Sequence, residues 1–102
     1  MTVGELLQLT PEELDWCEKS KTGDLTPSQF LRVSELQTRG YLLTHMAEGP
    51  ERAALEQECL QLKADLGAMP ADATMKAFQE IGQRHMALHR RVELAARQNP
   101  RK

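Results

Sequence analysis

The stretch that decides the fold is residues 72–98, DATMKAFQEIGQRHMALHRRVELAARQ. Its largely apolar stripe advances in alternating steps of three and four residues, through Phe78, Ile81, His85, Leu88, Val92 and Ala95. This spacing predicts one long helix whose stripe packs against neighbouring helices.

Two further stripes have the same rhythm. One runs through Leu55, Cys59, Leu62, Leu66 and Met69, and a less regular one through Phe30, Val33, Leu36, Gly40, Leu43 and Ala47. Three amphipathic helices bury their stripes against one another, within this chain or with a second copy of it. Because glycine is costly inside a helix, Gly40 predicts that another backbone passes close to that helix.

Capping residues and helix breakers set the expected boundaries. Thr10 and Thr26 each precede a proline, Asp72 is the expected cap of the last helix, and Gly49-Pro50 and Gly67–Pro70 are breaks. The expected helices span 11–20, 27–47, 50–68 and 72–98. The sequence therefore predicts a small all-α antiparallel bundle, with three long helices, one short N-terminal helix and coiled-coil-like packing. It forms a single domain over 1–102, with residues 1–9 and 99–102 frayed.

Composition supports this class and excludes others. Of the 102 residues 40% are hydrophobic but only 4% are aromatic, which favours helices over a strand sandwich. The net charge is −2, no stretch is long and apolar enough to span a membrane, and residues 1–20 lack a basic leader. With only Cys17 and Cys59, we expect reduced thiols and a cytoplasmic protein without membrane association.

Three histidines are the candidate metal ligands. His85 and His89 are four residues apart on one helix face, and the expected hairpins bring His45 toward the same end of the bundle. We favour the other interpretation, in which His85 is a polar residue of the stripe that fixes helix register and His89 lies on the surface. An interface that contains His85 would then weaken on acidification.

Residues with catalytic potential are sparse. The sequence has no serine with a base signature and no glycine-rich phosphate loop, and its carboxylates are dispersed. We therefore expect no enzyme activity, no catalytic residues and no cofactor, metal included.

The basic C-terminal region offers an alternative function. It contains Lys76, Arg84, Arg90, Arg91, Arg97, Arg101 and Lys102. These side chains could contact the phosphates of a nucleic acid, as in a nucleic-acid-associated regulator. The other interpretation is that they pair with acids of neighbouring helices or of a partner protein.

The function that the sequence favours is a small protein-interaction module, namely an adaptor, an inhibitor or a dedicated chaperone. Apolar residues outside the stripes, together with one arginine, predict the binding surface. It comprises Leu31, Tyr41, Leu42, Met46, Met86, Arg90 and Leu94. The same excess predicts a homodimer through the second and fourth helices. Alternatively, an N-terminal segment with Leu6, Leu7, Leu9, Leu14 and Trp16 covers this surface and leaves a monomer.

Overall fold

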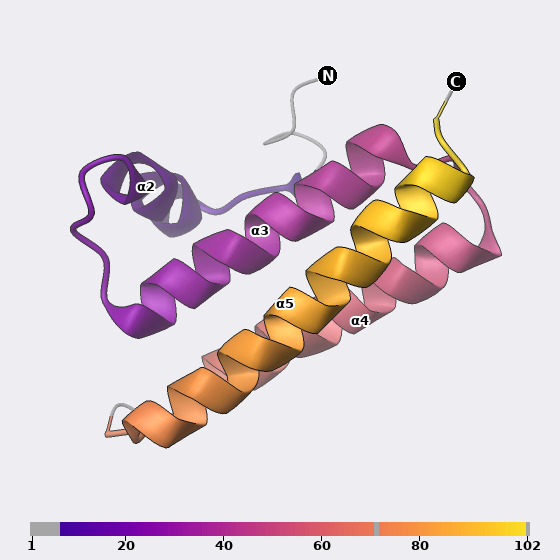
Figure 1. Cartoon of the computed structure of the whole chain (residues 1–102). Coiled ribbons are helices and arrows are strands. Elements are labelled where there is room, and N and C mark those ends of the chain that lie inside the picture. The colour runs from indigo at the N-terminus through magenta and orange to yellow at the C-terminus, as the bar shows by residue number, and fades with distance from the viewer. Residues whose placement is uncertain (1–6, 71, 102) are drawn as a thin grey trace.

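The protein is an all-α bundle, as expected from its sequence. The computed structural model describes residues 7–70 and 72–101. Its helices are α2 (Pro11–Ser20), α3 (Pro27–His45), α4 (Pro50–Gly67) and α5 (Met75–Gln98), shown in Figure 1. Across these described ranges, none of the helices has both the length and the apolar character needed to cross a lipid bilayer.

The first two helix starts follow the expected capping chemistry. Thr10 and Thr26 both form a capping box, with Glu13 and Gln29 as the reciprocal partners. The cap expected at Asp72 is wrong, because α5 begins later. Thr74 is its N-cap, and the Thr74 hydroxyl accepts a hydrogen bond from the backbone N–H of Ala77 at 3.2 Å.

Residues 99–101, for which the sequence predicts fraying, lie against the end of α3. The N–H of Ala47 donates a hydrogen bond to the carbonyl of Asn99 at 2.9 Å. The N–H of Arg101 donates to the carbonyl of His45, also at 2.9 Å. The Arg101 guanidinium donates to the carbonyl of Leu43, also at 2.9 Å. These bonds satisfy backbone carbonyls that the end of a helix leaves without a partner. The positive charge of Arg101 also interacts favourably with the negative end of the α3 dipole. Consequently α3 stops at His45, two residues before the expected end.

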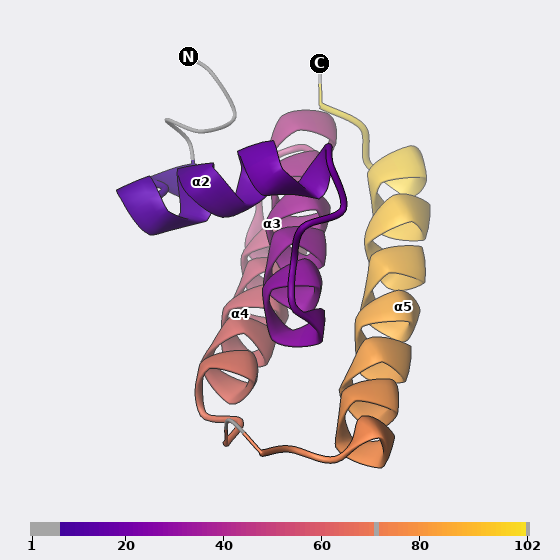
Figure 2. The same ribbon diagram turned by 90° about the vertical axis from the view of Figure 1, so that its left-hand side faces the viewer.

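Helix α3 occupies the centre of the bundle. It packs against both α4 and α5, while α2 crosses it on another side (Figures 1 and 2). Short connections make α4 antiparallel to α3 and to α5, so α3 and α5 run in the same direction.

The main core lies where α3, α4 and α5 meet. Its buried members are Leu42, Met46, Leu55, Cys59, Leu62, Leu66, Leu88, Val92, Ala95 and Ala96. The stripe expected for α4 is thus buried, and so is the C-terminal half of the α5 stripe. Farther toward the start of α5, Ile81 and Phe78 are only half-buried.

The stripe expected for α3 is largely buried, but it is not part of the main core. Val33, Leu36 and Leu43 are buried, and the last two join Leu7 in a second small cluster, whereas Phe30 is 59% exposed. The main core instead contains Leu42 of α3 and Met46, the residue directly after α3, and both are completely buried. The expectation that these two residues lie on an exposed surface is therefore wrong.

The N-terminal segment covers α3 on a side next to the main core, where Glu13 of α2 also pairs with Lys63 of α4 at 3.6 Å. Leu9 and Cys17 pack against the second cluster, and Trp16 is buried with the guanidinium of Arg32 4.6 Å from its ring centroid. Leu14 remains 51% exposed. Leu6 lies outside the described residues.

Replacing Leu62 by alanine tests the main core. Leu62 is fully buried between helices that cannot close around the gap, so we expect a loss of about 2 to 5 kcal/mol in the free energy of unfolding. The matched control is Leu14→Ala at an exposed position, which should change it by less than about 0.5 kcal/mol. Urea titration measures both. Equal losses in the two variants would show that Leu62 does not fill the core.

Candidate protein-binding groove

An apolar groove runs between α3 and the first half of α5. It consists of two adjoining hollows of about 490 and 560 Å³ that share Phe30, Leu31 and Gln79. The first hollow also has Ser20, Gly23, Leu25, Pro27, Met75 and Phe78, and the second has Ser34, Gly82, Gln83, His85 and Met86. We call this surface the α3/α5 groove.

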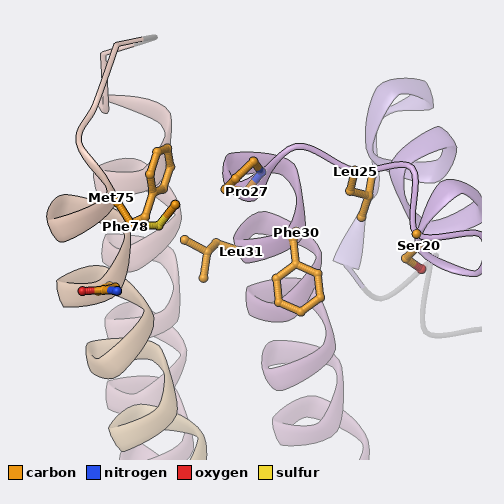
Figure 3. A pocket seen from close by; sticks show the side chains of 9 residues that line it. Ser20, Leu25, Pro27, Phe30, Leu31, Met75 and Phe78 are labelled. Carbon is orange, nitrogen blue, oxygen red and sulfur yellow. The ribbon is translucent and has the colours of Figure 1, made fainter.

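The rims of the groove are large apolar side chains exposed to solvent. Met75 is 65% exposed and Met86 54%, and both flank the groove together with Phe30. Figure 3 shows Leu31 between the two helices, with Met75 and Phe78 on the α5 side and Phe30 on the α3 side. Such a cluster on a small protein is typical of a binding surface.

Gly82 deepens the middle of the groove. A Cβ atom at this position would lie 3.7 Å from Cδ2 of Leu31, which is ordinary van der Waals contact. An alanine would therefore fit, although it would make the groove shallower. Glycine costs about 1 kcal/mol relative to alanine inside a helix, so Gly82 lowers the stability of α5.

Beside the groove, Thr38 joins α3 to α5 through two histidines. Its hydroxyl lies 2.8 Å from Nε2 of His85 and 2.8 Å from Nδ1 of His89. His85 Nε2 is also 3.1 Å from the carbonyl oxygen of Ser34, so this nitrogen carries the proton and donates. Thr38 can then donate its one proton to His89 Nδ1, and His89 Nε2–H points at Glu93, 2.9 Å away. We call these five residues the histidine clamp.

The clamp agrees with the interpretation that His85 is a polar residue that links two helices. His89, expected on the surface, is half-buried and also bonded. The expected approach of His45 does not produce a three-histidine site, since its ring stacks on Tyr41 at 4.1 Å between centroids. In the described part of the chain, no three His, Cys, Asp or Glu side chains are grouped to hold a metal ion.

The residues expected to bind a partner are divided among three places. Leu31 and Met86 line the groove, and Arg90 is exposed one turn beyond Met86. Leu94 is exposed but lines a separate hollow between α4 and α5.

The other three expected residues lie inward. Tyr41 is half-buried against the main core. Leu42 and Met46 belong to that core, so in the folded chain they cannot touch a partner.

Sequence reasoning missed several residues of the groove. The apolar spacing assigns Phe30 and Phe78 to buried stripes. It does not point to Gly82, which lies inside a helix with Met75 and Met86 on the same side. The signal in the sequence that indicates the groove is a glycine inside a helix, Gly82, seven residues after Met75 and four before Met86.

Most basic side chains of α5 pair with acids. Arg91 makes two hydrogen bonds of 2.7 Å to the Glu58 carboxylate, and Arg84 pairs with Asp65, so both link α5 to α4. Arg97 lies 3.6 Å from Glu93 of its own helix. These contacts match the interpretation in which the arginines neutralise neighbouring acids.

A second polar group is buried within α3. Arg39 Nε lies 3.1 Å from Glu35 Oε2, yet the angles are poor, and neither Glu35 oxygen has a properly oriented hydrogen bond among the described residues. Burial raises the pKa of the Glu35 carboxyl to about 7, although the Arg39 charge opposes this. A pair of this kind is costly to bury and offers no opening to a substrate, because Glu35 is 1% exposed.

Comparisons of the chain with protein-family models, curated proteins and solved structures gave no significant match.

The histidine clamp makes stability depend on pH. Burial lowers the pKa of His85 in the folded protein, so the unfolded chain takes up a proton first as the pH falls. The stability contributed by His85 is complete above about pH 6.5 and is lost below it. Relative to His85→Gln, which cannot titrate, the native protein should lose stability between about pH 7.5 and 5.5. Urea titrations across this range measure the difference, and a constant difference would show that folding does not bury the His85 imidazole.

Glu35 should give the opposite dependence. Its pKa is raised on folding, so its contribution is complete below the unfolded value of 4.5 and is lost as the pH rises toward 7. Compared with Glu35→Gln, the native protein should lose on the order of 2 to 3 kcal/mol between about pH 5 and 8. The same urea titrations test this effect. A native protein that gains stability over this range, relative to the variant, would show that Glu35 is ionised and well paired.

Proposed function

We propose that this chain is a small helical protein-interaction module that binds a partner protein through the α3/α5 groove, as an adaptor, an inhibitor or a dedicated chaperone. The observation that carries the proposal is the joint exposure of Phe30, Met75 and Met86 along one continuous apolar groove. A binding partner that covered these side chains would remove apolar surface from water, worth about 25 cal/mol for each Å².

The main core does not need these residues. It is closed by Leu42, Met46, Leu62 and Val92, all fully buried without help from Phe30 or Met75. The exposed apolar side chains are therefore surplus to folding, which supports a role in recognition.

The nucleic-acid alternative has less support. Arg84 and Arg91 are engaged by Asp65 and Glu58, which reduces the positive charge available for phosphates. We propose the cytoplasm as the location, where Cys17 and Cys59 would remain the free thiols that they are here. The homodimer stays a prediction.

Paired alanine variants test the groove. Phe30→Ala/Met86→Ala removes two exposed side chains of the groove, and Leu14→Ala/Leu94→Ala removes two of similar exposure elsewhere. Each protein is used to capture its partner from an extract of the cells that produce it, and the affinity of the identified partner is then measured. The groove variant should bind at least about tenfold more weakly, as expected when hot-spot residues are truncated.

The control pair should bind like the native protein. Circular dichroism should show that all three proteins are equally helical, since the replaced residues are exposed. Loss of binding in the control alone would move the site away from the groove. Capture of nucleic acid, with an affinity that falls steeply as salt is added, would favour the alternative function.

A further inference from the structure

One edge of the α3/α5 groove carries two basic side chains that have no acidic partner among residues 7–70 and 72–101. Of the basic side chains in α5, Arg84, Arg91 and Arg97 have acidic partners, whereas Lys76 and Arg90 form no ion pair with any described residue. Both are exposed. The two unpaired cations are therefore free to meet charges of another molecule.

Their positions relate them to the groove. Lys76, Gln79, Gln83, Met86 and Arg90 follow one another at steps of three and four residues, so they form one stripe along α5. Gln79, Gln83 and Met86 of this stripe line the groove. Lys76 and Arg90 consequently stand at the two ends of its α5 edge.

The groove has the dimensions of a site for a helix. From Met75 to Met86 it follows α5 for twelve residues, a rise of about 16 Å or three helical turns. Gly82 lies near the middle, beside Leu31, and lines the second hollow. Amphipathic helices bind such grooves through apolar residues spaced three or four positions apart.

A second copy of the chain fits this edge poorly. Lys76 and Arg90 are each seven residues from Gln83, so a twofold axis there would place Lys76 of one copy near Arg90 of the other. Like charges opposed in this way disfavour association. The charge pattern instead complements carboxylates.

We propose that the α3/α5 groove binds an amphipathic helix of a separate protein, with acidic side chains along the edge that faces Lys76 and Arg90. This inference rests on the proposed function and specifies its partner. Apolar residues of that helix would cover Phe30, Met75 and Met86. Its carboxylates would pair with the two cations and select its orientation.

Two synthetic peptides serve as probes. Both are about 18 residues long and helical, with leucines spaced three and four apart. One carries glutamates beside the leucines and the other carries lysines at the same positions. Fluorescence anisotropy should show that the native protein binds the glutamate peptide about tenfold more tightly, and added salt should reduce this preference.

The variants separate the inference from the function on which it rests. Lys76→Gln/Arg90→Gln should lose the preference for glutamate but still bind through the leucines. The control Lys19→Gln/Lys21→Gln makes the same change of net charge at the end of α2 and should keep the preference. Phe30→Ala/Met86→Ala should weaken the binding of both peptides.

Other outcomes overturn specific claims. Equal binding of both peptides, lost in Phe30→Ala/Met86→Ala, would keep the groove and reject the acidic partner. No binding of either peptide at about 1 mM would reject the helix. Unchanged binding in Phe30→Ala/Met86→Ala would reject the groove itself. If sedimentation shows a dimer of the native protein that this variant lacks, the occupant is a second copy.

Discussion

Helix α3 is packed on two neighbouring sides, and the other elements are arranged around it. Leu42 and Met46 face α4 and α5, while Leu36 and Leu43 face residues 7–9 and α2. A helix covered in this way must bury polar residues along with apolar ones, as Glu35, Thr38 and Arg39 show. Little of its surface is left for solvent, and the exposed part near its start borders α5. The groove is what remains open after α3 has been covered on both sides.

The histidine clamp determines how α5 lies along α3. Thr38 has one proton to donate, so its bonds to His85 and His89 form together only when His85 Nε2–H donates to it and an unprotonated His89 Nδ1 accepts from it. Sliding α5 by one turn would break both bonds. In the observed register Leu31 lies against Gly82, and Met86 stays at the rim of the groove. Polar contacts in the interface thus help to maintain the apolar groove beside them.

Much of the fold could be predicted from the sequence because caps and stripes are local signals. Thr10 and Thr26 start their helices as expected, and the α4 stripe is buried. The side of α3 that meets the main core could not be predicted, because a helix that is apolar on two sides does not show which side meets which neighbour. The exposure of Phe30 depends on where the α2–α3 connection runs, which no spacing encodes. Docking of residues 99–101 relies mainly on backbone hydrogen bonds, which leave no pattern in the side chains.

The central claim is that Met46, directly after α3, is buried in the main core, while Met86 of α5 is exposed at an open groove. Methyl NMR of protein labelled at methionine, with a soluble paramagnetic agent added, tests it directly. The signals of Met75 and Met86 should broaden strongly, and that of the fully buried Met46 should remain sharp. If Met46 broadens as much as Met86, then α3 exposes the face that we place in the core, and the groove is not the surface described here.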